Sequence, residues 1–305
     1  MARIYDTAFL GEKLLPMSDA SLSIASSAIL YGLSVYTVLP LCATKDGIAA
    51  FRVSDHFKRL CNSSRLIGID TFEPAWTEER FLQTIRDLAE ANKITEDVFL
   101  RATIHVTDLA PGTRSRGLTT ILSIFLYEAK PILPATGARV KISPWQRVSD
   151  RAIPPRAKVN GAYVNSVLAK QDALDGDYDD ALFLNASGHV SELSAANIFL
   201  VKDGTLITPS VSSDILEGIT RRTIIELAKE MAVLVEEREV EKDELFTADE
   251  IFASGTSAFV APITEIDGKK IGDGSMGTLT AQLQKAHQEI LHGTHLRSKE
   301  LLTKL

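Results

Sequence analysis

The sequence has 305 residues, of which 45% are hydrophobic and 24% charged, as in ordinary folded proteins. A formal net charge of −7 excludes broad electrostatic attraction to nucleic acid or anionic membranes, and two cysteines are too few for a disulfide framework. The longest apolar stretch, 120–127, is far shorter than a bilayer-spanning helix, and the N-terminus lacks a signal-peptide pattern. We therefore expect a cytoplasmic globular protein with two domains.

In chain order, the first strong pattern is Asp46-Gly47 between apolar runs, which predicts a β-hairpin with a type I′ turn. Apolar residues recur at helical spacing over 78–90, directly after Thr77, which predicts a helix capped by that threonine. The segment 130–137 holds two prolines and a glycine and is interpreted as an interdomain linker. It separates a predicted smaller domain over 1–129 from a larger one over 138–305.

The second half of the chain alternates turn signals with helical patterns. Ser187-Gly188, Asp203-Gly204 and Asp267-Gly268 each lie between apolar runs and predict further hairpins. Helical spacing predicts helices over 221–232 and 279–291, the second of which ends before Gly293. Strand pairs are therefore expected to be largely antiparallel, which argues against a doubly wound parallel sheet and favours an α+β architecture.

Two further patterns suggest chemistry but are better explained by structure. The stretch 272–277 matches G-x-G-x-x-G, but the residues that follow it are too few for the βαβ unit of a dinucleotide site, so we interpret it as a turn before the last helix. The six histidines lack metal-ligand spacing and are expected to be solvated at the surface. We therefore predict no metal site.

The segment Arg156-Ala-Lys-Val-Asn-Gly-Ala-Tyr163 places Lys158 after two prolines and among small and apolar residues. A lysine in such surroundings can lose solvation, which lowers its pKa and lets its amine act as a nucleophile. Taken alone, a lysine is far more often a surface charge. The segment by itself therefore leaves both interpretations open.

The blocks that decide between them recur along the chain in a fixed order. They are Leu30-Tyr-Gly-Leu-Ser-Val-Tyr36, His56-Phe-Lys-Arg-Leu60, Lys158-Val-Asn-Gly-Ala-Tyr163, Val190-Ser-Glu-Leu-Ser-Ala-Ala-Asn-Ile-Phe199, Leu216-Glu-Gly-Ile-Thr-Arg221 and Ala253-Ser-Gly-Thr-Ser-Ala258. Over nearly its whole length the chain resembles the fold-type IV (class IV) pyridoxal-phosphate aminotransferases, most closely the branched-chain amino-acid aminotransferases. The resemblance implies the D-amino-acid aminotransferase-like fold, with a smaller N-terminal α/β domain and a larger C-terminal domain of mainly antiparallel strands with helices.

The resemblance also implies residue roles toward pyridoxal 5′-phosphate. Lys158 would be the catalytic lysine that binds the cofactor covalently, Glu192 would keep the ring nitrogen protonated, and Tyr163 would hydrogen-bond the phenolic oxygen. The phosphate ligands would be Arg59, Gly218, Ile219, Thr220, Gly255 and Thr256. Without the resemblance, Glu192 would be a solvent-facing hairpin acid, Thr220 a helix N-cap and Arg59 a surface helix residue.

Substrate residues match the family less closely. The family's aromatic-x-Arg motif reads Phe99-Leu-Arg101 here, and Arg101 would pair with the γ-carboxylate of glutamate or 2-oxoglutarate. Tyr36 would wall the side-chain pocket, and Tyr31 would reach into the partner subunit's site. Further substrate contacts are expected from Thr256 and Ser257, and the loop 107–113 would cross a dimer interface.

Three departures from the family's pattern all touch substrate-side positions. Thr37-Val38 replaces the usual Glu-Gly, 191–197 differs from the usual Ser-Glu-Gly-x-Gly-Glu-Asn, and Phe99 replaces a tyrosine. The resemblance implies a transaminase that moves an amino group between an apolar, branched L-amino acid and 2-oxoglutarate in a ping-pong cycle. It also implies a homodimer or higher homo-oligomer with the site at the interface. The departures keep open a D-amino-acid or (R)-amine transaminase, or an aminodeoxychorismate lyase. A non-catalytic homologue is a third hypothesis, and the matched Lys158, Tyr163 and Glu192 argue against it.

Overall fold

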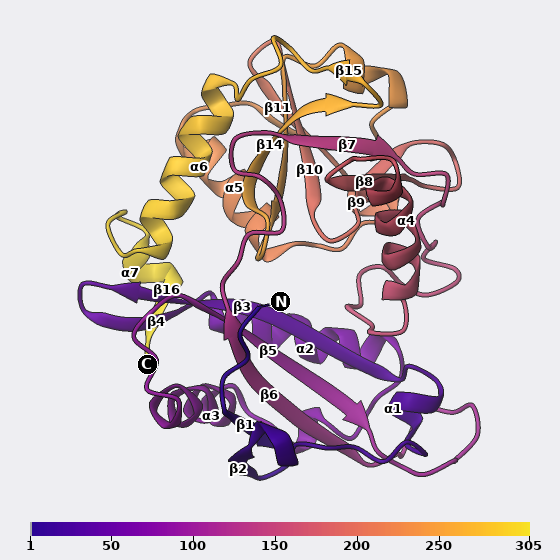
Figure 1. Cartoon of the computed structure of the whole chain (residues 1–305), viewed down its shortest axis with the longest axis vertical. Helices are drawn as coiled ribbons and strands as arrows, with labels where there is room; N and C mark the ends of the chain where they lie inside the picture. The colour runs from indigo at the N-terminus through magenta and orange to yellow at the C-terminus, as the bar shows by residue number, and fades with distance from the viewer. Residues whose placement is uncertain (1) are drawn as a thin grey trace. The chain divides into compact units, whose positions relative to one another are not determined.

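The computed structural model describes residues 2–305 and divides the chain into two compact units (Figure 1). Unit 1 comprises Met1–Lys130, Ala157–Ala162 and Ile290–Leu305, and unit 2 comprises Pro131–Arg156 and Tyr163–Glu289. The first division falls at the start of the predicted linker 130–137. The two later segments of unit 1 lie within the predicted domain 138–305, and they join unit 1 because each pairs with one of its strands.

Unit 1 is built on an antiparallel sheet with the strand order β16-β4-β3-β5-β6-β1-β2 among the described residues. Its strands are β1 (Thr7–Leu10), β2 (Lys13–Pro16), β3 (Ser34–Thr44), β4 (Gly47–Phe51), β5 (Val98–Val106), β6 (Thr120–Glu128) and β16 (Leu302–Lys304). Its α-helices are α1 (Ser27–Leu30), α2 (Val53–Leu66), α3 (Glu78–Ala91) and α7 (Ser298–Leu301), and short 3-10 helices are η1 (Met17–Asp19) and η2 (Glu73–Ala75). Helix α2 packs against β3 and α3, and it presents His56, Phe57 and Leu60 to the core.

The local predictions for unit 1 hold with one difference. Helix α3 begins after Thr77, whose hydroxyl accepts a hydrogen bond from the backbone N–H of Arg80 at 3.1 Å, so the predicted cap is confirmed. Strands β3 and β4 form the hairpin predicted at Asp46-Gly47. Its turn is not type I′, because only Gly47 has a positive φ there and the Thr44 hydroxyl instead bonds the turn backbone.

Unit 2 is built on a sheet with the strand order β12-β11-β10-β13-β14-β7-β8-β9, and β15 also pairs with β14, among the described residues. The strands are β7 (Ala138–Ile142), β8 (Asp180–Leu184), β9 (Val190–Leu193), β10 (Asn197–Lys202), β11 (Thr205–Pro209), β12 (Val235–Arg238), β13 (Glu250–Gly255), β14 (Phe259–Ile266) and β15 (Lys269–Lys270). The helices are α4 (Tyr163–Asp175), α5 (Ile219–Glu230) and α6 (Thr278–Leu291), with short 3-10 helices η3 (Val211–Ser213) and η4 (Lys242–Phe246).

Most strand pairs of unit 2 are antiparallel, as predicted, and three are parallel: β11 with β12, β14 with β7, and β7 with β8. Two of these join strands separated by a helix, α5 before β12 and α4 before β8, which is the connection that parallel pairing needs. Asp203-Gly204 and Asp267-Gly268 form hairpin turns in which both residues have positive φ, so type I′ geometry is confirmed there. Within the described chain, no helix is long and apolar enough to cross a membrane.

The glycine-rich loop 272–277 has a structural role. The carboxylate of Glu250 accepts hydrogen bonds from the backbone N–H groups of Leu279 and Thr280, at 3.1 and 2.8 Å, and from the Thr280 hydroxyl. A Cβ atom at Gly277 would lie only 2.0 Å from the Glu250 side chain. The N-terminal amides of α6 are therefore occupied by a side chain of the same unit, where a dinucleotide site would need them for phosphate.

The expectation of solvated histidines is wrong for His56, which is 1% exposed on α2. It is also wrong for His287, which is 2% exposed on the inner side of α6. Its ring lies 6.5 Å from that of Phe259. Burial lowers the pKa of His287 from its ordinary value of 6.5 to about 4. The sequence does not predict this burial, because the polar neighbours of His287 lie on the solvent side of the same helix.

We predict that His287 makes the fold acid-sensitive. Between pH 6.5 and 4 the unfolded chain takes up a proton at this histidine and the folded chain does not, so stability present above pH 6.5 is lost as the pH falls. The loss attributable to this group is about 3 kcal/mol. In urea denaturation, His287→Gln should therefore cost less stability at pH 4.5 than at pH 7. Gln282→Ala, at an exposed and uncharged position of the same helix, should show no such trend, and a pH-independent cost of His287→Gln would contradict the prediction.

Candidate active site

Lys158 is held at the edge of β3 in unit 1. Val159 forms an antiparallel bridge with Val35; the Tyr36 N–H donates to the Lys158 carbonyl at 2.9 Å and the Asn160 N–H donates to the Ser34 carbonyl at 2.9 Å. On this edge of β3, strand β4 pairs with Leu41–Thr44, so the lysine segment occupies the part of the edge that β4 leaves open. Lys158 and Asn160, two residues apart, therefore project on the same face of the sheet as Ser34 and Tyr36.

On that face the structure brings three predicted site residues together. The Tyr36 ring lies 3.7 Å from the Arg101 guanidinium carbon and 4.9 Å from the Lys158 Nζ atom, measured to its centroid. Arg101 is opposite Val38 in the β3–β5 register, so it lies diagonally from Tyr36 and can reach across the ring. Burial first, and the positive charge of Arg101 second, lower the pKa of His105 to about 4, so that histidine is neutral at pH 7.

Arg59 lies on the other side of β3. Thr37, the neighbour of Tyr36 in the strand, faces α2, where its hydroxyl is 2.8 Å from the His56 Nδ1 atom and accepts a hydrogen bond from the Arg59 guanidinium at 3.2 Å. Thr37 and His56 are buried. One departure from the family's pattern, Thr37, is therefore a direct partner of the arginine that the resemblance assigns to phosphate binding, and the resemblance did not indicate this contact.

Glu192 is a buried carboxylate of unit 2, not a solvent-facing hairpin acid. It lies on β9 and is 5% exposed, while its Oε1 atom is 2.7 Å from the Arg147 guanidinium. Its Oε2 atom accepts hydrogen bonds from the Asn197 side-chain amide at 3.0 Å and from the Leu216 N–H at 3.1 Å. A buried carboxylate needs such donors, and here they fix its orientation.

The same amide fixes the start of α5. Asn197 also donates to the Leu216 carbonyl at 2.9 Å, and a Cβ atom at Gly218 would lie 2.1 Å from the Asn197 Oδ1 atom. Gly218 is the N-cap of α5, followed by Ile219 and the buried Thr220. Asn197 thus connects the residues predicted to bind phosphate at the start of α5 to Glu192, the residue predicted to contact the ring nitrogen.

The other predicted residues of unit 2 fall at the ends of strands and helices. Gly255 ends β13, one residue beyond Ser254, which is opposite Asn197 in the β10–β13 register; Thr256 and Ser257 follow in the turn to β14. Tyr163 begins α4. Neither Arg147 nor Asn197 is among the predicted site residues. Asn197 lies inside a matched block, and Arg147 lies in no motif.

Two predicted substrate residues have different surroundings. Phe99 is fully buried on β5, with its ring centroid 5.6 Å from that of Tyr127. Tyr31 follows α1 and is exposed. Their substrate contacts remain predictions.

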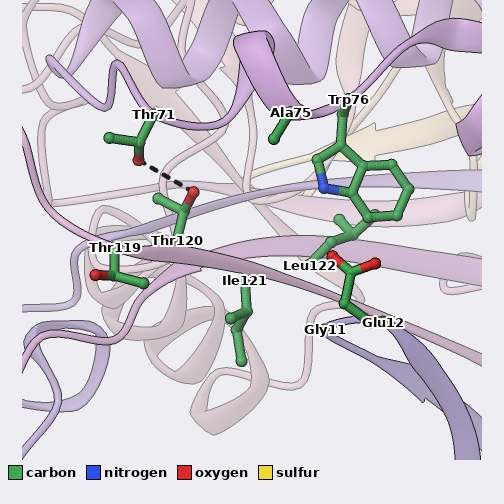
Figure 2. A pocket seen from close by; sticks show the side chains of 9 residues that line it. All are labelled: Gly11, Glu12, Thr71, Ala75, Trp76, Thr119, Thr120, Ile121 and Leu122. Atoms are coloured by element: carbon green, nitrogen blue, oxygen red, sulfur yellow. Dashed lines mark hydrogen bonds between the residues drawn. The ribbon is translucent and has the colours of Figure 1, made fainter.

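A surface pocket of about 270 Å³ in unit 1 lies apart from these residues (Figure 2). It is lined by Gly11, Glu12, Thr71, Ala75, Trp76, Thr119, Thr120, Ile121 and Leu122, none of which is a predicted site residue. Figure 2 shows the hydrogen bond between the Thr71 and Thr120 hydroxyls at 3.1 Å on one side of the pocket and Trp76 near Glu12 on the other.

Comparisons with known proteins identify the family to which the chain belongs. The family profile described as amino-transferase class IV matches residues 35–266. A probable branched-chain-amino-acid aminotransferase of Aquifex aeolicus (strain VF5) is 38% identical over 302 residues, which is 98% of this chain and 96% of that protein. The solved branched-chain amino acid aminotransferase of Escherichia coli superposes with a TM-score of 0.94 at 30% identity, covering 98% of this chain and 99% of that one.

A second solved structure carries information on the cofactor. A branched-chain amino acid aminotransferase from T.th., complexed with N-(5′-phosphopyridoxyl)-L-glutamate, has a TM-score of 0.90 at 30% identity and covers 98% of each chain. The chain belongs to the class IV aminotransferase family, and the predicted α+β fold-type IV architecture is confirmed. It is an aminotransferase that depends on pyridoxal 5′-phosphate.

The residues present fit that cofactor in kind. Unit 2 offers a buried carboxylate with fixed orientation, suited to a protonated ring nitrogen, and the N-terminal amides of α5 behind a glycine, suited to a phosphate. Unit 1 offers the Lys158 amine and the Arg59 guanidinium. Arg221, adjacent to Thr220, is used otherwise: its guanidinium bonds the Thr208 hydroxyl, the Pro209 carbonyl and Glu237, which anchors α5 to the sheet.

We predict that Gly218→Ala disrupts the start of α5. The added methyl group must displace the Asn197 amide, which loosens both the Glu192 carboxylate and the helix N-terminus, at a cost of about 1–3 kcal/mol. Thermal denaturation and fluorescence titration with pyridoxal phosphate should show lower stability and weaker binding. Gly176→Ala, where the new Cβ meets only ordinary contacts, is the control and should stay within about 0.5 kcal/mol. Unchanged cofactor affinity in Gly218→Ala would contradict the prediction.

Proposed function

We propose that the protein transfers an amino group between an apolar, branched L-amino acid and 2-oxoglutarate by a ping-pong mechanism. The observation that carries the proposal is the shared face of Tyr36, Arg101 and Lys158. An aromatic ring offers a wall for an apolar side chain, and a guanidinium offers a partner for a second carboxylate. The two alternating substrates of the reaction need both, next to the reactive amine. The branched-chain names of the relatives support the same choice.

The roles of the chain's residues in this proposal follow from their chemistry. Pyridoxal 5′-phosphate, when bound, supplies an electron sink for negative charge at the substrate α-carbon. Lys158 would hold the cofactor covalently, and its released amine would take up and return the proton of the substrate α-carbon. Glu192 keeps the ring nitrogen protonated, and Tyr163 donates a hydrogen bond to the phenolic oxygen. The phosphate would be held by Arg59, Gly218, Ile219, Thr220, Gly255 and Thr256. Ser257 would contact the substrate together with Thr256.

We predict that Lys158→Ala abolishes both turnover and the visible absorbance of the lysine-bound cofactor, because no other group is proposed to form that bond. The control is Lys285→Ala, whose side chain is 78% exposed; it should keep both properties. Absorbance spectra and a coupled assay with L-leucine and 2-oxoglutarate measure them. Undiminished transamination by Lys158→Ala would refute the assignment.

The choice of substrate is tested by single-turnover absorbance titration of the cofactor-loaded protein. We expect L-leucine to bleach the lysine-bound cofactor band with gain of the pyridoxamine form, and D-alanine to leave it unchanged. Bleaching by D-alanine alone would move the protein to the D-amino-acid branch of the family. Release of pyruvate from aminodeoxychorismate without an amino acceptor would identify the lyase instead.

We further propose that the enzyme is a cytoplasmic homodimer that associates through the surface around α1. The loop 107–113 pairs with the segment before α1, through the Ser26–Leu109 bridge and the hydrogen bond from the Ala110 N–H to the Ala25 carbonyl at 3.0 Å. Large apolar side chains that are at least 46% exposed gather on these segments: Ile24, Ile29, Leu30, Tyr31 and Leu109. Such a group on one surface is typical of a protein–protein interface.

We predict that the double variant Ile29→Asp, Leu109→Asp dissociates the dimer, because two carboxylates would have to be desolvated in the interface. Sedimentation velocity should show a dimer for the unaltered protein and a monomer for the variant. Leu296→Asp, at a residue that is 89% exposed elsewhere in unit 1, is the matched control and should stay dimeric. A dimer that persists in the double variant would place the interface elsewhere.

A further inference from the structure

Asn160 makes a connected set of contacts that neither the sequence blocks nor the comparisons explain. Its backbone N–H donates to the Ser34 carbonyl at 2.9 Å, and its side-chain amide donates to the Ser34 hydroxyl at 2.8 Å. Its Oδ1 atom accepts a hydrogen bond from the Arg101 guanidinium at 2.5 Å. The amide is therefore oriented by β3 on one side and bonds Arg101 with the other.

The path of Arg101 shows why this contact matters. The backbone of Arg101 lies on β5, opposite Val38, whereas Asn160 lies opposite Ser34 on the other edge of β3. The Arg101 side chain therefore crosses β3 to reach Asn160. The Tyr36 ring lies beneath the guanidinium over this crossing, at 3.7 Å. Among the described residues, Asn160 accepts the hydrogen bond of this guanidinium, which carries five N–H groups. The remaining N–H groups are available for a carboxylate.

Resting on the proposed function, we infer that Asn160 is a positioning residue that sets the preference for dicarboxylate over monocarboxylate substrates. A free arginine side chain must lose much rotamer entropy to grip a ligand. Asn160 and Tyr36 hold the guanidinium in one place before the substrate arrives, so that loss no longer weakens the binding of a γ-carboxylate. Because the contact acts through Arg101, it favours glutamate and 2-oxoglutarate selectively, and leucine has no second carboxylate to benefit.

The test compares two ligands on the cofactor-loaded enzyme. Binding of glutarate, a dicarboxylate, and of 4-methylvalerate, a branched monocarboxylate, is measured by absorbance titration, and single-turnover rates are measured with L-glutamate and L-leucine. We expect Asn160→Ala to lower the ratio of glutarate affinity to 4-methylvalerate affinity about tenfold. The ratio of the second-order rate constants for L-glutamate and L-leucine should fall in parallel. A general loss of folding would move both ligands together and leave the ratios unchanged.

Two further variants sharpen the result. Ser34→Ala removes the hydroxyl that orients the amide but keeps the backbone bond, so its ratios should fall between those of the unaltered enzyme and Asn160→Ala. Asn62→Ala, at an exposed position of α2, is the control and should match the unaltered enzyme. Ratios for Asn160→Ala within about twofold of the unaltered enzyme would overturn the inference. If the unaltered enzyme reacts with neither amino acid, the proposed function fails, and the glutarate-to-4-methylvalerate ratio still decides the role of Asn160.

Discussion

The short backbone pairing between Val159 and Val35 is the constraint on which the arrangement in unit 1 depends. It converts a connecting segment into an additional edge partner of β3, and the alternation of a strand then fixes where each side chain projects. Gly32 and Gly161 make the approach possible, since a Cβ atom at Gly32, whose φ is +65°, would lie 2.9 Å from the Gly161 Cα atom. Larger residues at either position would push the lysine-bearing segment off the sheet.

In unit 2 a buried charge organises the corresponding elements. Glu192 is satisfied by donors from three places in the chain: Arg147 before α4, Asn197 at the start of β10 and the Leu216 backbone before α5. Any displacement of these elements would leave a carboxylate unpaired in a water-poor environment, which is costly. The electrostatic requirement of one residue thus holds a strand, a turn and a helix start in register.

Local sequence signals predicted much of this fold. Turn dipeptides with glycine and helical spacing depend on neighbours in the chain, so the hairpin at Asp203-Gly204 and the cap at Thr77 could be read directly. The partners of Glu192 and the contact of Asn160 with Arg101 could not, because residues far apart in the sequence meet only after folding. Helix α2 is indicated only by the family block at 56–60. The burial of His287 is not predicted, because its neighbours in the sequence are polar and suggest an exposed segment.

The connectivity of the two units has a consequence for synthesis on the ribosome. Unit 2 is inserted into unit 1 at two points, and β4 finds its outer partner β16 only after residues 302–304 have been made. Loop-closure entropy for a pairing across some 250 residues of chain is paid late, when unit 2 can already be folded. Until then β4 exposes an unpaired edge in the nascent chain, which is the kind of surface that chaperones recognise and that promotes misassociation between neighbouring nascent chains.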